Sequence, residues 1–163
     1  MLTGTLKFSI AAVPSTLRVI GGREIPFVRA ILSLSNTGDT KAAGVAPHAT
    51  FSEERGLVHD ATEALRRAVT ADLIPPGGDL KWDIYDLLLA AHPGVASKIH
   101  LWGYKAVLNW WIDFSAWAEY REEGAETHSQ TGVSRWKLRW VPAVPSSEEI
   151  ELNFEEIGDA EAG

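Results

Sequence analysis

The chain has 163 residues, of which 45% are hydrophobic and 23% charged, a composition that excludes a disordered chain and fits one globular domain. The absence of cysteine excludes disulfides, cysteine metal sites and a cysteine nucleophile. The net charge of −7 equals the seven acidic residues of segment 146–163, because the residues before it carry 15 acids and 15 bases. A body that is neutral overall is not expected to bind nucleic acid.

The first residues, MLTGTLKFSIAAVP, lack a basic region followed by a long apolar run, because Lys7 interrupts the apolar residues. This pattern predicts no signal peptide. No segment reaches the roughly 18 uncharged apolar residues of a membrane span. We therefore expect a soluble, cytoplasmic protein that does not contact a membrane.

Alternation of apolar and polar residues predicts that most of the chain is β-strand. The clearest apolar alternations are Leu6, Phe8 and Ile10; Val28, Ala30, Leu32 and Leu34; Trp136, Leu138 and Trp140; and Ile150, Leu152 and Phe154. Turn signals separate them, including NTGD at 36–39, PPGGD at 75–79 and a hairpin turn at Glu123–Gly124. We expect one domain, residues 1–157, folded as an antiparallel two-sheet sandwich that is immunoglobulin-like, with a jelly roll as the alternative, followed by an acidic disordered end at 158–163.

Two segments carry helical signals between the strands. HDATEALRRAVTADL has Asp60 as an N-cap and Glu63 three residues later, the arrangement of a capping box. Its apolar residues Leu65, Val69 and Leu73 fall on one helical face. The sequence therefore predicts a short helix after Asp60.

The second helical segment, DLKWDIYDLLLAAHPG, offers Asp79 as its N-cap and a Pro–Gly stop. If it is helical throughout, Asp79, Asp83 and Asp86 share one face, as a polar stripe or as paired carboxylates. Leu80, Trp82 and Ile84 also alternate, so the alternative is that the segment begins as a strand.

The turns at 36–39 and 75–79, with the residues around them, resemble those of a known kind of module. LSLSNTGDTKAAGV and LIPPGGDLKW look like bacterial immunoglobulin-like modules of the CARDB or NEW3 kind over about a third of the chain, through Asn36, Gly38, Ala42 or Ala43, Val45 and Pro75 to Gly78. The resemblance implies an interaction or spacer module and supplies no catalytic residues. Residues 51–73 and the segment DIYDLLLAA depart from these modules.

Known catalytic and metal-binding motifs are absent from the sequence. No two of the five histidines stand at H-x-x-x-H spacing, and there is no G-x-S-x-G, G-x-G-x-x-G or Walker loop. His59, Asp60 and Glu63 could hold a metal at a helix start, but a capping aspartate beside an exposed histidine explains the same residues. We expect no metal, cofactor or catalytic residue, and an enzyme without a recognisable motif remains an alternative.

The tryptophans between 100 and 117 divide by parity. The even residues, including Trp102 and Trp110, are nearly all apolar and are expected in the core. Trp111 falls on the opposite, polar face between Asn109 and Asp113, with Trp117 as its companion. Trp111, Asn109, Asp113 and Trp117 are therefore our candidate partner-binding residues. The alternatives are a covering helix or loop, or a β-bulge that resets the phase.

These observations predict a non-catalytic protein-binding or assembly module. A self-assembling structural subunit, such as a shell or virion component, and a carbohydrate or small-ligand binding domain are the alternatives. A C-terminal segment ordered through Phe154 and paired as an edge strand favours assembly by strand addition.

Overall fold

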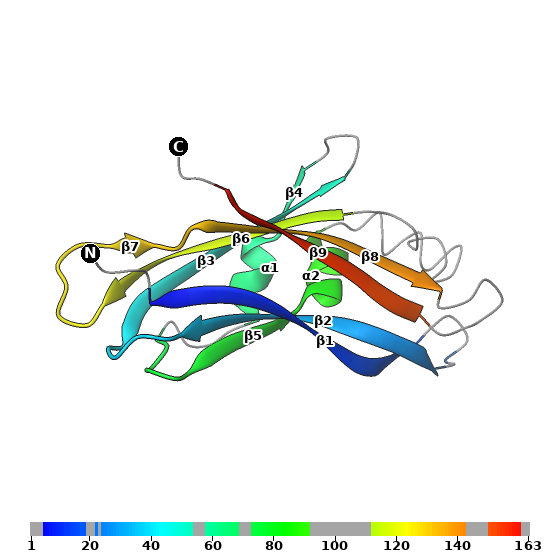
Figure 1. Ribbon diagram of the computed structural model, residues 1–163, viewed down its shortest axis with the longest axis horizontal. Helices are drawn as coiled ribbons and strands as arrows, with labels where there is room; N and C mark the ends of the chain where they lie inside the picture. Colours follow the sequence, from blue (N-terminus) through cyan, green and yellow to red (C-terminus); the bar gives the residue numbers. More distant parts are fainter. Residues whose placement is uncertain are drawn as a thin grey trace.

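A computed structural model describes residues 5–18, 22, 24–53, 58–68, 73–91, 112–142 and 150–160. These residues form two antiparallel sheets in two layers, with two short helices between them (Figure 1). The smaller sheet has the order β1 (Leu6–Arg18), β2 (Glu24–Asn36), β5 (Asp79–Asp83). The larger sheet has the order β4 (Val58–Asp60), β3 (Ala42–Glu53), β6 (Ile112–Glu122), β8 (Val133–Pro142), β9 (Ile150–Ala160), and β7 (Ser129–Gln130) pairs with β6.

The predicted β-sandwich is confirmed, and the strand order identifies its type. The first, second and fifth strands oppose the fourth, third, sixth and eighth. This is the partition of strands A, B and E against C′, C, F and G in the immunoglobulin fold. β9 adds one antiparallel strand beyond the position of strand G.

The core lies between the two sheets, where the alternating apolar residues meet. Of the predicted inward residues, Ile10 is only half-buried, and the side chains of Trp140, Ile150, Leu152 and Phe154 lie outside those that the structure describes. The following are buried: Leu6, Phe8, Ala30, Leu32, Leu34, Trp136 and Leu138. The start of β2 differs, because Phe27 is buried and Val28 is only half-buried. Phe27 packs edge to face against Tyr85, with the ring centroids 5.0 Å apart, at a part of β2 that β5 does not reach.

The segment beginning at Asp79 is a strand followed by a helix, so the alternative prediction is confirmed and Asp79 as an N-cap is wrong. β5 ends at Asp83 and α2 (Ile84–Ala91) follows directly. The true cap is Asp83, whose Oδ1 accepts hydrogen bonds from the backbone N–H groups of Tyr85 (2.9 Å) and Asp86 (3.2 Å). The three aspartates therefore do not share a helical face, because pairing with β2 holds 79–83 extended.

The first predicted helix is present but shorter, as α1 (Thr62–Arg67). The predicted capping box is wrong, because the N-cap is Ala61 and not Asp60. Asp60 lies one residue earlier, where it accepts a hydrogen bond from the N–H of Thr62 at 2.9 Å, and Glu63 forms an ion pair with Arg67. Leu65 is buried as predicted, Val69 is outside the described residues, and Leu73 lies beyond the helix and is 43% exposed.

Asn36 joins the two turns that carried the family resemblance. Its side-chain amide donates to the carbonyl oxygens of Thr40 (2.8 Å) and Ile74 (2.9 Å), and its Oδ1 accepts from the N–H of Gly38 (2.9 Å). Its backbone N–H donates to the carbonyl of Gly78 at 3.0 Å. The buried asparagine thus ties the turn after β2 to the turn before β5.

The hairpin predicted at Glu123–Gly124 is confirmed, because β6 ends at Glu122 and β7 pairs back onto it. β9 continues through Ala160, beyond the expected start of disorder at 158, because 158–160 pair with β8. Neither helix in the described ranges is long and apolar enough to cross a membrane.

Candidate functional site

The described part of the predicted partner-binding face begins at residue 112. Trp102, Asn109, Trp110 and Trp111 lie outside the described residues. Asp113 and Trp117 alternate with the buried residues Ile112, Phe114 and Ala116, and both are half-buried on the outer face of the larger sheet. The pairing of β6 with β3 runs without a register shift from Glu119 to Ile112, so no bulge reverses this stretch.

A stacked aromatic pair forms the centre of this face. His48 of β3 lies directly opposite Trp117 of β6 in the strand register. Their rings are 3.9 Å apart between centroids and 9° from parallel. Because cross-strand neighbours on one face lie about 5 Å apart at Cβ, pairing alone brings these two rings together. We call His48 and Trp117 the stacked pair.

Arg66 of α1 fixes the imidazole of the stacked pair. Its Nε donates to the backbone oxygen of Pro47 at 3.2 Å, and its Nη2 lies 3.2 Å from Nε2 of His48. Since a guanidinium can only donate, Nε2 accepts and the ring proton is on Nδ1. The ring of His48 is therefore held from one side by Trp117 and at its edge by Arg66.

The charges around His48 favour its neutral form. Burial and then the guanidinium of Arg66 lower the pKa of His48, while Glu119 and Asp60 oppose that shift. The nearer carboxylate oxygen of Glu119 is 3.9 Å from Nε2. A protonated ring could not accept from Arg66, so protonation breaks the contact that orients the ring.

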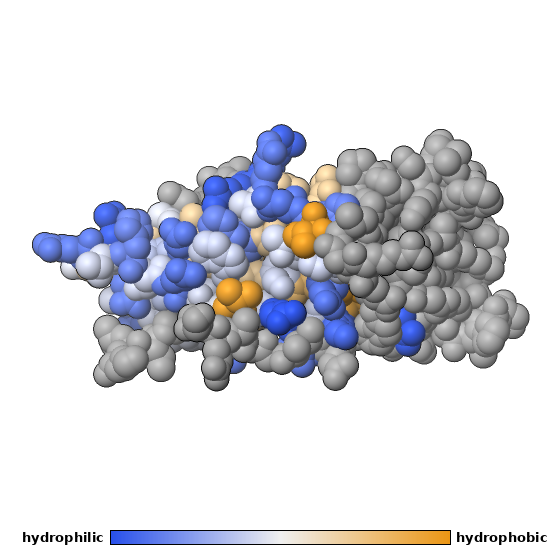
Figure 2. Space-filling view, turned by 90° about the horizontal axis from the view of Figure 1, so that it is seen from above, coloured by the Kyte–Doolittle hydropathy of each residue, from blue (hydrophilic) through white to orange (hydrophobic). Residues whose placement is uncertain are grey.

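Polar and charged residues continue the face beside the stacked pair. The register forms cross-strand rows from Thr50 to Ser115 and Arg135, and from Ser52 to Asp113 and Lys137. Arg135 and Lys137 are exposed. Figure 2 views the molecule from the side of the larger sheet, where the described surface is mostly hydrophilic with isolated hydrophobic residues. A stacked aromatic pair surrounded by polar residues is typical of a surface that can contact a protein partner and can also face water when no partner is bound.

A second charged cluster lies where β2 meets α2. Arg29 lies 3.4 Å from Asp83 and 3.6 Å from Asp86, and its guanidinium packs over the rings of Phe27 and Tyr85. Burial raises the pKa of Tyr85 to about 12. The cluster anchors the start of α2 to the smaller sheet.

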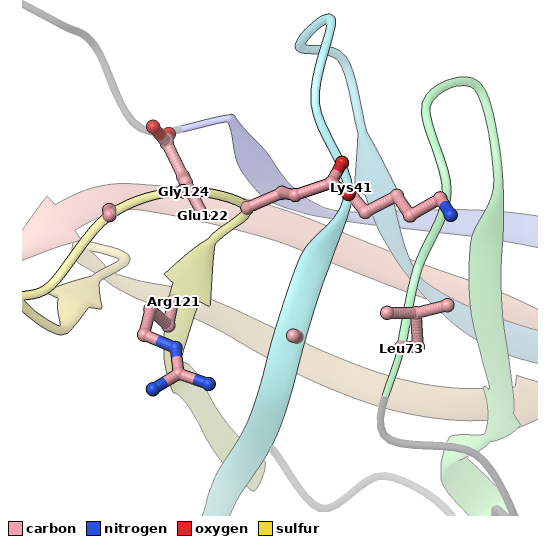
Figure 3. Close-up of a pocket in the computed structure, with 8 residues that line it drawn as sticks. Lys41, Leu73, Arg121, Glu122 and Gly124 are labelled. Carbon is pink, nitrogen blue, oxygen red and sulfur yellow. The ribbon is translucent and has the colours of Figure 1, made fainter.

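A pocket of about 370 Å³ lies at the end of the sandwich near the turn after β6. It is lined by Lys41, Ala43, Leu73, Arg121, Glu122, Glu123, Gly124 and Ala125. The cationic ends of Lys41 and Arg121 point away from each other in Figure 3. Ligand sites use a few polar groups that converge on the ligand, and these two do not.

Of the three residues considered as metal ligands, His59, Asp60 and Glu63, the last two have other interactions. Asp60 binds the backbone of Thr62, and Glu63 pairs with Arg67. Within the ranges that the structure describes, no three His, Asp or Glu side chains are grouped closely enough to hold a metal ion. In the same ranges, no hydroxyl is hydrogen-bonded to His48 as a nucleophile would be.

The sequence interpretation missed His48, which stacks on Trp117, and Arg66, which contacts His48. His48 lies in a segment of alternating apolar and polar residues, but no nearby residue indicates that it pairs with Trp117, 69 positions later. No family model and no curated protein matches this chain.

Proposed function

We propose that the protein is a non-catalytic protein-binding module that contacts its partner through the outer face of the larger sheet, around the stacked pair. The observation that carries the proposal is that Trp117 is partly exposed and stacked on His48, whose ring is in turn contacted by Arg66. An aromatic side chain that is already immobile loses little entropy on binding, which is why tryptophan is common among residues that dominate interfaces.

The residues around the stacked pair supply the polar rim of such an interface. Arg135 and Lys137 provide exposed donors, and Thr50 and Ser115 provide hydroxyl groups at half-buried positions. A tryptophan surrounded by polar residues that exclude water is the usual arrangement at a binding hot spot. The resemblance to CARDB or NEW3 modules implies the same class of function.

The carbohydrate alternative has less support from the geometry. A sugar ring stacks on a free aromatic face, and one face of the Trp117 indole is covered by His48 at 3.9 Å. Self-assembly through the same face remains the closer alternative, because a second copy is also a protein partner.

The test compares the wild type with Trp117→Ala and Trp117→Phe. We expect Trp117→Ala to fold normally but to lose at least about tenfold in affinity, a typical hot-spot loss, for whichever protein the wild type retains from cells that produce it. Trp117→Phe keeps a stacked ring and should retain most of the binding. Sedimentation velocity of each variant alone measures self-association.

Val13→Ala is the control, because Val13 is an exposed apolar residue on β1 of the smaller sheet, away from this face. A partner retained equally by Trp117→Ala and the wild type contradicts the proposal. So does a wild type that is monomeric and retains no partner, or one that responds to glycans alone with a change in tryptophan fluorescence that Trp117→Phe lacks.

A further inference from the structure

One ring nitrogen of His48 lies close to both a cation and an anion. Its Nε2 is 3.2 Å from Nη2 of Arg66, which belongs to α1, and 3.9 Å from Oε1 of Glu119, which belongs to β6. The same ring stacks on Trp117, with 3.9 Å between the ring centroids and 9° between the planes. The protonation state of Nε2 therefore determines which of the two charged groups it can bond.

In the neutral ring, Nε2 bonds Arg66. A guanidinium can only donate and an ionised carboxylate can only accept, so an unprotonated Nε2 can bond Arg66 but cannot bond Glu119. The side chain of Glu119 is 49% exposed, and in the part of the chain that the structure describes it forms no other ion pair. With His48 neutral, this place on the outer face therefore presents a carboxylate to solvent.

Protonation of the ring exchanges its partner. A proton taken up from solvent at Nε2 removes the lone pair that accepted from Arg66, and the resulting imidazolium and guanidinium repel each other. The new N–H can donate to Glu119. Charged hydrogen bonds of this kind are about 2.7–2.9 Å long, so Glu119 has to approach by about 1 Å, which rotation of its exposed side chain allows. The ring stays on Trp117, because the face of an indole attracts a cation.

The other groups around His48 do not take the place of Glu119. Asp60 of β4 attracts the protonated ring less than Glu119 does, and its carboxylate already accepts a hydrogen bond from the first backbone N–H of α1 at 2.9 Å. Ala46 and Thr50, which flank His48 on the same face of β3, carry no charge. Glu119 is therefore the acceptor that the protonated ring reaches.

We propose that His48 is a pH-sensitive switch on the outer face of the larger sheet, which bonds Arg66 when neutral and Glu119 when protonated while its ring stays stacked on Trp117. Burial and then the guanidinium of Arg66 lower the pKa of His48, so the exchange occurs on the acidic side of about 6.5, the ordinary value for histidine. Acidification pairs the carboxylate of Glu119 and releases the guanidinium of Arg66, so the charge offered beside Trp117 changes from negative to positive. The switch belongs to the chain alone and does not depend on the partner binding proposed above.

NMR of the full chain labelled with ¹⁵N follows this exchange. The imidazole signals that disappear in His48→Gln assign His48 among the five histidines. At about pH 7.5 we expect its proton on Nδ1, with the ¹⁵N shift of an unprotonated Nε2. At about pH 5 we expect both nitrogens protonated, the side-chain N–H signals of Arg66 shifted, and the nuclear Overhauser contacts between the rings of His48 and Trp117 retained.

Two substitutions should shift the midpoint of the His48 titration in opposite directions. Arg66→Gln removes the neighbouring cation and should raise the midpoint, whereas Glu119→Gln removes the acceptor of the protonated ring and should lower it. Arg67→Gln and Glu63→Gln are the matched controls. They make the same changes of charge on exposed side chains of α1 that pair with each other, and they should leave the midpoint near that of the wild type.

Three results would overturn the proposal. One is a proton on Nε2 of His48 at about pH 7.5, because Nε2 could not then accept from Arg66. Another is loss of the contacts between the two stacked rings on acidification. The third is a midpoint that Glu119→Gln leaves unchanged, or that either control shifts as far as its matched variant does. The remaining histidine signals of each variant show that it is folded.

Discussion

Replacing Asn36 by alanine tests whether one buried side chain joins the two turns at this end of the sandwich. The substitution removes two donors, to Thr40 and Ile74, and one acceptor for Gly38. A hydrogen bond contributes about 1 kcal/mol net, which gives about 3 kcal/mol for the three. Ile74 keeps a backbone bond from Ala42 at 3.0 Å, so its carbonyl is not left without a donor and the value is not raised further. For a domain of this size the loss corresponds to a fall in Tm of roughly 6–12 °C.

Urea unfolding followed by tryptophan fluorescence measures the loss. Asn36→Asp keeps the acceptor for Gly38 but sets a carboxylate against two carbonyl oxygens, so we expect it to be at least as destabilising at neutral pH as the alanine variant. Thr37→Ala is the control, because its hydroxyl makes one exposed bond to the carbonyl of Thr5 at 3.1 Å. A loss below about 1 kcal/mol for Asn36→Ala, or one no larger than for Thr37→Ala, would refute the reasoning.

Two further predictions concern α1 and the stacked pair. Trp82→Phe removes the buried bond from the indole N–H to the carbonyl of Leu65 at 2.8 Å, which joins β5 to α1, and should cost about 1–2 kcal/mol in urea unfolding; stability within a few tenths of the wild type would contradict that role. His48→Gln should make stability less dependent on pH. Because the folded protein lowers the pKa of His48, the unfolded chain binds the proton more tightly, and the wild type loses stability as pH falls through about 6.5. Urea unfolding at about pH 7.5 and about pH 5 measures this, and equal losses in both proteins would show that His48 does not contribute.

The sequence predicted which residues of each strand face the core, because alternation of apolar and polar residues is a local pattern. Leu32 and Leu34, like Phe114 and Ala116, are buried at the alternating positions that the period of two assigns to the core. The outward placement of Asp113 and Trp117 followed from the same alternation. Asn36 and Gly38 also marked a turn correctly, although the sequence did not indicate that the asparagine reaches Ile74.

The segment from Asp79 to Asp83 shows where local signals conflict. Its apolar residues fit both the periodicity of a helix and the alternation of a strand, so the sequence was consistent with either prediction. Pairing of Leu80 with Leu34 and of Trp82 with Leu32 supplied the deciding contacts, because it buries Trp82 against the core and leaves Asp83 free to cap α2. Tertiary contacts of this kind commonly override local propensity.

By itself the sequence determined the β-rich class, the faces of its strands, the main turns and the acidic, alternating pattern of the last strand. The tertiary structure decided which strands are neighbours and in what register, and with them the stack of His48 on Trp117, the contact of Arg66 with His48, and the place of β9 at the end of the larger sheet. The physical reason is that alternation and turn chemistry act between residues close in the chain. Register depends on pairing between residues far apart, and the local pattern of one strand does not specify its partner.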